Sequence, residues 1–505
     1  MILLTTTLLS ACGNDLLETV PNDRLSSAVY WQTQQDAIYA ANAVYTYLEN
    51  AERYMMWDGM SDIGHMNQVW GDCSKIEKGD FNSQTLQVQA EWNEYYSGIQ
   101  TANTFLQNID RVVTNDVELI NRLKGEVRTL RAYFYIKLAS IYGDVPLITG
   151  PISLEESRDL LRTPIDQVWD FVSKELQEAA DLLPVEPKEA GRVTRGAALA
   201  LNARAMLYAG RYTEAAVSAK QVMDLNVYSL YPSYEDLFTY AAENNQEVIF
   251  DKQQVKGVYP NNIFYLITPS SIWPTNLAFE IVPTKNAVDA YAMSDGKAIS
   301  DPTSSFDPFD PYTNRDPRLG YSIVVPGDVL PDGEIYDSRP GSGTGDAVGL
   351  NQSSTTTGFD VKKYLNVEDL NDPQNCGINL ILLRYAEVLL TYAEARIEAN
   401  QIDQGVLDAI NEVRQRPDVS MPVVTTTNQD ELRQIVRNER LVELAFEGLR
   451  YFDIRRWRIA ENVIPGIVSG MTYSDAGNLK TVSLPLFEKS FNKDQHYLWP
   501  IPQRD

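Results

Sequence analysis

Near its C-terminus the chain reads Arg437-Asn-Glu-Arg440-Leu-Val-Glu443-Leu-Ala-Phe446-Glu447-Gly-Leu-Arg450-Tyr451-Phe452-Asp453-Ile-Arg455-Arg-Trp457. Its apolar residues recur at the spacing of one helical face, so the segment predicts a single helix. Glu443 and Glu447 lie one turn apart, and each has an arginine three residues away, which predicts ion pairs between neighbouring turns. Aromatic rings are interleaved with these charges. We therefore expect both sides of the helix to pack and the charges to form a structural ion network, rather than a solvated face or a catalytic centre.

Four other blocks of sequence accompany this segment. They are Gly125-Glu-Val-Arg128-Thr-Leu-Arg131-Ala-Tyr133-Phe134-Tyr135 with Tyr142-Gly143-Asp144-Val-Pro146-Leu147, Gly191-Arg192-Val-Thr194-Arg195-Gly196, Leu383-Arg384-Tyr385-Ala386-Glu387, and Leu498-Trp499-Pro500-Ile501-Pro502. In this order the blocks resemble the signature of the SusD-like (RagB/SusD) family of outer-membrane nutrient-binding lipoproteins. The resemblance extends from about residue 15 to the last residue.

Two segments have the residue spacing of tetratricopeptide helix pairs. Each segment has suitable residues at the small, turn and packing positions of this repeat. In the first segment they are Ala203, Gly210, Tyr212, Ala215 and Ala219, and in the second they are Ala393, Asn400, Ile402, Gly405, Ala409 and Pro417. Small residues allow paired helices to approach each other closely. Together with the family resemblance, this spacing predicts a mainly α fold with a scaffold of stacked helix pairs.

Other helices are predicted from capping and periodicity. Thr33 and Asp36 form a capping pattern that starts a helix running to about Glu49. We expect this helix to pair with residues 85–110, and residues 116–141 to pair with 164–182.

We expect one folded unit over residues 13–505. A helical repeat lobe is predicted at about 28–224 and 380–460, and a C-terminal segment at 461–505. Between residues 225 and 379 the apolar runs shorten to strand length, and Pro, Gly, Ser, Thr, Asn and Asp cluster. This part is predicted to be a loop-rich lobe with short strands, a natural place for binding loops.

Composition limits the partners of the protein. The 505 residues include 43 basic and 69 acidic side chains, a formal net charge of −26. This balance argues against binding to nucleic acid, whose phosphates require basic patches. It equally disfavours direct docking to anionic lipid headgroups.

The first twelve residues predict the cellular location of the protein. Met1–Cys12 is a short apolar run ending in Leu-Ser-Ala-Cys, which matches a bacterial lipobox, although the positively charged start of a signal peptide is missing. We expect residues 1–12 to be a lipoprotein signal segment and Cys12 to carry the lipid. Cys73 and Cys376 have no spacing that indicates a pair, and we expect both to be free.

Catalytic and metal-binding patterns are scarce. The chain has two histidines, which argues against histidine metal sites and Ser-His-Asp catalysis, and His65 is interpreted as a loop or rim residue. The oxygen-rich run Asp307, Asp310, Asn314 and Asp316 lacks the spacing of a calcium loop and is interpreted as a polar turn. We predict no metal, no cofactor and no enzyme activity. With 69 acidic residues, the sequence alone does not exclude a pair of catalytic carboxylates of the glycosidase type.

Two stretches have the composition of a sugar-binding surface, in which aromatic rings stack on sugars and polar groups orient them. They are residues 57–72, with Trp57 and Trp70 among polar residues outside any clear helix pattern, and residues 259–276, with Tyr259 and Trp273. The family resemblance implies a ligand face built from loops at these positions. We predict that Trp70 and Trp273 line the pocket and that Asp62 and Asn67 hydrogen-bond the ligand.

The family resemblance implies a cell-surface lipoprotein, anchored in the outer membrane and facing the exterior, that binds oligosaccharides. It also implies delivery of the ligand to a SusC-like TonB-dependent β-barrel transporter. A binder of peptides or other nutrients with the same architecture is the first alternative, and a glycoside hydrolase is a second. A third alternative is a structural subunit that only stabilises the transporter.

Overall fold

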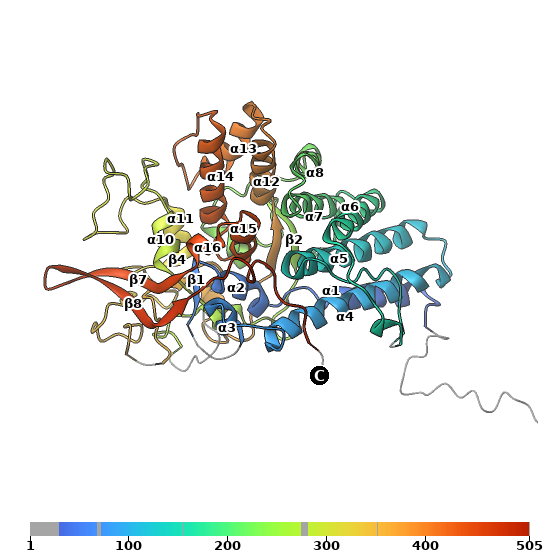
Figure 1. The fold of residues 1–505 in the computed structure, drawn as a ribbon, viewed down its shortest axis with the longest axis horizontal. Helices are drawn as coiled ribbons and strands as arrows, with labels where there is room; N and C mark the ends of the chain where they lie inside the picture. Colours follow the sequence, from blue (N-terminus) through green and yellow to red (C-terminus); the bar gives the residue numbers. More distant parts are fainter. Residues whose placement is uncertain (1–29, 68–71, 154, 274–280, 351, 504–505) are drawn as a thin grey trace, which may run out of the picture.

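The fold is taken from a computed structural model, which describes residues 30–67, 72–153, 155–273, 281–350 and 352–503. The helices are α1 (Gln34–Tyr45), α2 (Ala51–Gly59), α3 (Asp72–Lys78), α4 (Leu86–Asn108), α5 (Val117–Tyr142), α6 (Ile165–Leu182), α7 (Arg195–Tyr208), α8 (Tyr212–Asp224), α9 (Ile263–Ile267), α10 (Lys285–Ala290), α11 (Arg318–Ser322), α12 (Tyr385–Glu398), α13 (Gln404–Arg414), α14 (Gln429–Glu443), α15 (Arg450–Arg456) and α16 (Ala460–Val463). The strands are β1 (Gly64–Met66), β2 (Val248–Lys252), β3 (Ile281–Pro283), β4 (Ile323–Val324), β5 (Asp360–Val361), β6 (Leu380–Arg384), β7 (Gly466–Asp475) and β8 (Asn478–Lys489). The predicted mainly α fold is confirmed (Figure 1).

Both predicted repeat segments form antiparallel helix pairs. The chain turns between α7 and α8 at Gly210, whose φ of +71° is a conformation that glycine adopts without steric cost. Asn400, at the equivalent position between α12 and α13, has φ +53°, and asparagine is among the few side chains that tolerate this region. The alanines of α7 are almost all buried, which lets neighbouring helices pack closely.

The helices stack in the order α4, α5, α6, α7, α8 and α12, each packed on the next. Helices α8 and α12 lie side by side although the whole loop-rich region separates them in sequence (Figure 1). This region is therefore inserted between two halves of one helical stack. Helix α1 begins with the predicted capping box of Thr33 and Asp36, ends at Tyr45 rather than near Glu49, and packs on both α4 and α5.

The described strands form four two-stranded antiparallel sheets, paired β1–β3, β2–β6, β4–β5 and β7–β8. The first three pairs join segments that are far apart in sequence: β1 follows α2, for example, while β3 precedes α10. Their strands are mostly buried. The β1–β3 pair fastens the loop-rich region to the segment after α2, the β2–β6 pair fastens it to the start of α12, and the β4–β5 pair joins two parts of the loop-rich region itself.

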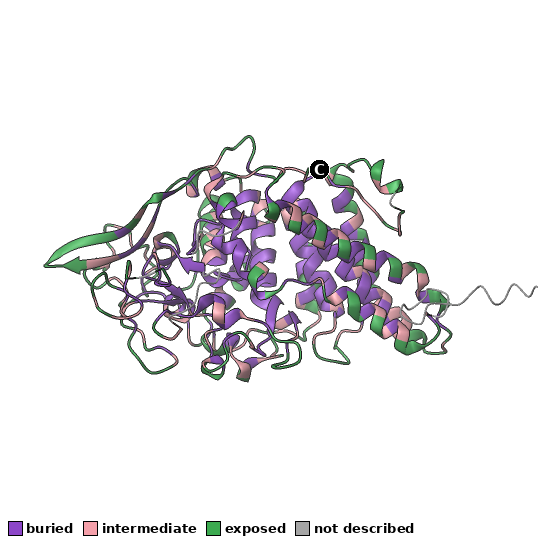
Figure 2. Cartoon of the chain, turned by 90° about the horizontal axis from the view of Figure 1, so that it is seen from below, coloured by how far each residue is buried: buried purple, intermediate pink, exposed green. Residues whose placement is uncertain are grey.

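The hairpin of β7 and β8 was not predicted from the sequence. Its turn contains Ala476 and Gly477, both with positive φ (+49° and +83°), the geometry that two-residue hairpins require. The hairpin projects from the body of the protein in Figure 1 and is largely exposed in Figure 2. The buried residues in Figure 2 instead run through the helical stack.

The segment 437–457 is two helices, which corrects the prediction of one. Helix α14 ends at Glu443, and the chain turns through Phe446 (φ +61°) and Gly448 (φ +75°) before α15 begins. A Cβ atom at position 448 would lie 2.7 Å from the backbone oxygen of Tyr54, so the turn packs directly on α2.

The charges of this segment form a buried network, as predicted, but their partners come from distant parts of the chain. Glu443 is fully buried and accepts from the guanidinium groups of Arg318 (2.9 Å), Arg384 (2.7 Å) and Arg416 (2.9 Å). Glu447 pairs with Arg384 and Lys363, each at 2.7 Å. We call these six residues, with Asp316, Glu247 and Glu439, the core ion network.

Mutual pairing maintains the ionised state of this network. Burial alone raises the pKa of the Glu443 carboxyl, but Arg416, Arg384 and Arg318 together hold it well below its usual value. Each guanidinium contacts at least two carboxylates, so the cost of removing the charges from water is offset by short, multiple ion pairs. The core ion network therefore fixes the helical stack against the loop-rich region.

Candidate ligand-binding site

The stretch 57–72 starts inside a helix, which corrects the expectation of an irregular surface. Trp57 belongs to α2 and is fully buried, with its ring 5.2 Å from Tyr451 and 5.0 Å from Phe452, centroid to centroid. Its indole Nε1 donates to Glu49 at 3.2 Å. Trp57 is thus a core residue that joins α2 to α15.

Asp62 is held by a buried ion pair rather than presented to solvent. Its two carboxylate oxygens accept from Nε and Nη2 of Arg450 at 2.9 and 2.8 Å, and the residue is 6% exposed. Arg450 is the first residue of α15, so this ion pair connects the segment between α2 and β1 to the start of α15. The structure thus places Asp62 in a buried ion pair with Arg450, and its role as a ligand contact stays a prediction.

Asn67 is also buried and bridges to another loop. Its amide donates to the Ser354 carbonyl at 3.3 Å, and its carbonyl oxygen accepts from the Thr356 backbone N–H at 2.8 Å. The side chain thus connects two protein segments, and its role as a ligand contact stays a prediction. Trp70 lies outside the described residues, as does Cys12. Trp273 is half-buried at the end of a turn in which its backbone N–H donates to the Pro269 carbonyl.

A pocket of about 540 Å³ lies where the two predicted stretches meet. Met66 belongs to the first stretch and Leu266 to the second, while Met56 belongs to α2 just before the first stretch. All three side chains line the pocket and are buried. The pairing of β1 with β3 and the packing of α2 on α9 bring these segments together. We call this hollow the α2–α4 pocket, because α2 and the start of α4 supply most of its remaining lining. Its volume is in the range of small-ligand sites.

Polar side chains from α2 and α4 surround the apolar part of this pocket. Arg53 pairs with Glu94 and with the buried Glu91, each at 2.9 Å, while Gln87 donates to Glu91 at 2.8 Å. The Glu94 side chain keeps 35% of its surface exposed. Glu52 accepts from the Asn262 amide at 3.1 Å, which ties α2 to the second stretch.

The α2–α4 pocket thus combines a buried apolar lining with half-exposed hydrogen-bonding groups. This chemistry suits an uncharged ligand with both apolar faces and hydroxyl groups. Arg53, Gln87 and Glu94 were not predicted from the sequence to be ligand-binding residues, because each lies on a regular helix and resembles an ordinary surface residue. Among its described lining residues the pocket has no aromatic ring; Trp70 precedes the lining residue Asp72 by two positions.

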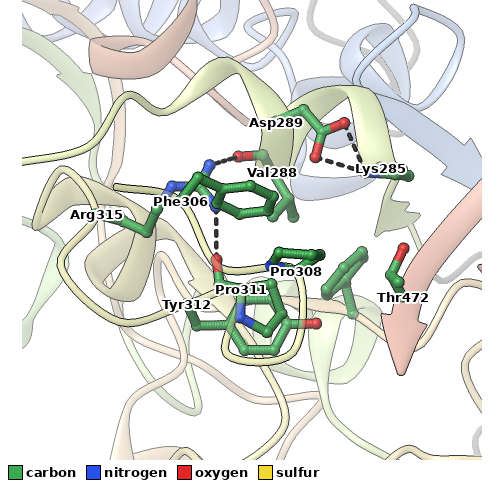
Figure 3. A pocket seen from close by; sticks show the side chains of 10 residues that line it. Lys285, Val288, Asp289, Phe306, Pro308, Pro311, Tyr312, Arg315 and Thr472 are labelled. Carbon is green, nitrogen blue, oxygen red and sulfur yellow. Dashed lines mark hydrogen bonds and ion pairs between the residues drawn. The ribbon is translucent and has the colours of Figure 1, made fainter. Parts of the chain in front are cut away.

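A smaller cavity, of about 90 Å³, lies in the loop-rich region beside the hairpin (Figure 3). Phe306, Tyr312 and Phe359 contribute rings, and the Lys285–Asp289 ion pair (2.7 Å) lies at its edge. The cavity is well below the usual volume of a ligand site. The oxygen-rich run 307–316 supplies part of its lining. In that run Asp307 and Asp310 form a turn through their backbone groups, in agreement with a polar turn.

Other reactive side chains are accounted for by packing. His65 is in β1, is 1% exposed and contacts Glu77 at 2.8 Å, which corrects the expectation of a loop or rim position. Cys73 and Cys376 are both free and buried, as predicted. Within the described ranges no three His, Cys, Asp or Glu side chains form a group that could hold a metal ion.

Comparison with known proteins identifies the family. The sequence model of the SusD family matches residues 239–505, and a second, described as "Starch-binding associating with outer membrane", matches residues 16–207. The first match covers more than half of the chain. The protein belongs to the SusD family, and the resemblance noted in the sequence is confirmed.

Individual relatives agree over almost the whole length. A SusD-like protein P38 of Formosa agariphila is 25% identical over 94% of this chain and 93% of its own. A crystal structure described as a SusD-like carbohydrate binding protein of Bacteroides fragilis is similar with a TM-score of 0.86 at 28% identity, covering 94% of this chain and 98% of that one. A second SusD-like structure from the same species has a TM-score of 0.81 at 28% identity, covering 96% and 97%. In the part of the chain that the structure describes, no helix has both the length and the apolar character needed to span a membrane.

Proposed function

We propose that this protein binds oligosaccharides at the outer surface of the outer membrane and delivers them to a SusC-like TonB-dependent transporter. Family membership supports the proposal, as does the carbohydrate-binding description of the Bacteroides fragilis relative. The single observation that carries it is the α2–α4 pocket, in which Met66 and Leu266 come from the two stretches whose composition predicted a sugar-binding surface.

In this proposal the protein binds the oligosaccharide and does not change it chemically. Sugar rings have apolar C–H faces bordered by hydroxyls, so they match an apolar lining bordered by Gln87, Glu94 and Arg53. We propose that Trp70 and Trp273 supply stacking rings to this surface. A lipid on Cys12 and docking on the transporter would keep captured ligand at high local concentration near the pore, so that even a weak site raises uptake.

Affinity electrophoresis of the purified protein through gels containing plant, microbial and host polysaccharides tests the ligand class. Retardation by one class of polysaccharide supports the proposal and identifies the substrate. No retardation by any polysaccharide, from protein with a cooperative melting transition, contradicts it and favours peptide capture. Chromatography of the polysaccharide after incubation separates a binder, which leaves its length unchanged, from a hydrolase, which shortens it.

The aromatic contacts have their own test. Replacing Trp70 and Trp273 together by alanine is expected to lower the affinity for the retarding polysaccharide at least tenfold, about 1.4 kcal/mol, because stacking area is lost. Unchanged retardation of a folded double variant would remove both rings from the site.

A further inference from the structure

A second pocket, of about 420 Å³, lies between the C-terminal half of α1, the loop before α7 and the end of β2. Its lining includes Asn42, Tyr45, Asp251, Lys252, Gln253 and Tyr259. We call it the Tyr259 pocket. It shares no lining residue with the α2–α4 pocket, although both pockets include a residue of the short connection between α1 and α2: Leu48 lines the Tyr259 pocket and Asn50 lines the α2–α4 pocket.

Tyr259 presents an exposed ring on a fixed backbone. The ring belongs to a residue that is 46% exposed, although its backbone N–H and C=O both pair with Val255, at 2.8 and 2.9 Å. The Lys252 ammonium lies 5.7 Å from the ring centroid and is held by the Leu48 carbonyl at 2.8 Å. A large aromatic surface with little conformational freedom to lose is the kind of group on which flat ligands stack.

Fixed polar groups accompany the ring. The buried Asp251 carboxylate accepts from the Gln253 amide at 2.7 Å, and the same amide donates to Asn244 at 3.1 Å. Gly191 allows this arrangement, since a Cβ atom there would lie 2.2 Å from Cγ of Gln253. Among the described residues, no group hydrogen-bonds the exposed Asn42 amide, which is therefore available to a ligand.

The charges around the pocket disfavour an ionic ligand. Arg192 is neutralised by Glu126 (3.2 Å) and Glu189 (3.0 Å), and the charge of Lys252, which donates to a backbone carbonyl, is opposed by Asp251 in the same lining, so the basic groups do not form an uncompensated anion site. The Asp251 carboxylate would also repel an anion. A ring with amide and carboxylate neighbours instead fits a neutral ligand rich in hydroxyl groups.

We infer that the Tyr259 pocket is a second carbohydrate-binding site, in which Tyr259 stacks on a neutral sugar ring while the side-chain carbonyl oxygen of Gln253 and the Asn42 amide hydrogen-bond its hydroxyls. The inference rests on the proposed function for its ligand class, but not for its location. Two sites that both border this short connection would let the protein hold an oligosaccharide at two points, which raises its overall affinity.

Calorimetric titration with maltohexaose, cellohexaose, xylohexaose and mannohexaose tests this site. Tyr259→Ala is expected to lower the affinity for the hexaose that binds most tightly about tenfold. Tyr259→Phe, which keeps the ring, is expected to retain the affinity. Tyr39→Ala is the matched control, because Tyr39 is a 59% exposed tyrosine of α1 that lines neither pocket. All variants are expected to melt at the temperature of the unsubstituted protein.

A Tyr259→Ala protein that binds all four hexaoses as the unsubstituted protein does would overturn the inference. Ala90→Trp, which places a ring in the α2–α4 pocket, separates this result from failure of the proposed function. Loss of binding in Ala90→Trp alone leaves the proposed function standing and removes the second site. Loss in Tyr259→Ala, whether alone or with loss in Ala90→Trp, supports the second site. An unsubstituted protein that binds none of the hexaoses contradicts both.

Discussion

The core ion network and the α2–α4 pocket both contain arginine–glutamate pairs, but in opposite settings. In the network, Glu443 is fully buried and contacts three arginines. At the pocket, Glu94 keeps 35% of its side-chain surface exposed and contacts one arginine, Arg53. A carboxylate whose oxygens are all engaged by protein groups stabilises the fold, whereas a half-exposed one keeps hydrogen-bonding capacity for a ligand. The difference predicts that substitutions in the network change stability, and that those at the pocket change binding.

Glu443→Gln is expected to have the largest effect, a loss of about 3–5 kcal/mol in the free energy of unfolding. Removing one carboxylate leaves three buried guanidinium groups with fewer partners. Denaturant unfolding followed by circular dichroism measures the loss. Asp430→Asn on the same helix is the control, since that carboxylate is 90% exposed and its loss should cost about 0–1 kcal/mol. Equal midpoints for the two variants would refute the distinction between buried and exposed pairs.

Asp62→Asn is expected to lower the free energy of unfolding by about 3 kcal/mol, because Arg450 keeps its charge in a buried position without its two-point partner. Asp475→Asn, which affects a half-exposed pair with Lys480, is the control and should cost about 0–1 kcal/mol. If Asp62→Asn instead unfolded like the unsubstituted protein but lost polysaccharide retardation, Asp62 would be a ligand contact after all.

Asp58 should make stability depend on pH near neutrality. Burial raises the pKa of this carboxyl to about 7, although the backbone N–H groups of Gly448 and Arg450 donate to it at 3.0 Å. Because the pKa is higher in the folded than in the unfolded chain, folding takes up a proton below pH 7, and stability rises as pH falls through that value. Between pH 8 and 5.5 this contributes about 2 kcal/mol. Asp58→Asn should remove that part of the pH dependence, and parallel stability–pH curves for the two proteins would contradict the assignment.

Glu94→Gln is expected to have the smallest effect on stability, about 0–1 kcal/mol, because its pair with Arg53 is partly exposed. It should nevertheless weaken retardation by the bound polysaccharide several-fold, since a hydrogen-bonding group of the pocket is altered. A stability loss comparable to that of Glu443→Gln would place Glu94 with the structural pairs instead.

Local signals predicted much of the fold. The capping pair of Thr33 and Asp36 and the turn at Gly210 depend on residues close in sequence, and both appear as expected. The hairpin had a local signal too: Ala476-Gly477 lies between segments of strand composition, and this turn was overlooked.

The features that local sequence patterns did not show share a cause. Asp62 and Arg450 are 388 positions apart, so no local pattern shows that they pair. The break at Phe446 and Gly448 likewise depends on contact with α2, which periodicity within 437–457 does not report. The composition of the two stretches did identify where the α2–α4 pocket forms, but not which side chains face it.

Titration of the Ala90→Trp and Gln100→Trp proteins with the best-retarding oligosaccharide tests directly whether the α2–α4 pocket is the ligand site. Ala90 lines the α2–α4 pocket, while Gln100 is an exposed residue on another face of the same helix. We expect at least a tenfold loss of affinity, about 1.4 kcal/mol, for Ala90→Trp and unchanged affinity for Gln100→Trp, with similar melting temperatures. Equal affinities for the two variants would contradict the assignment of this pocket as the ligand site.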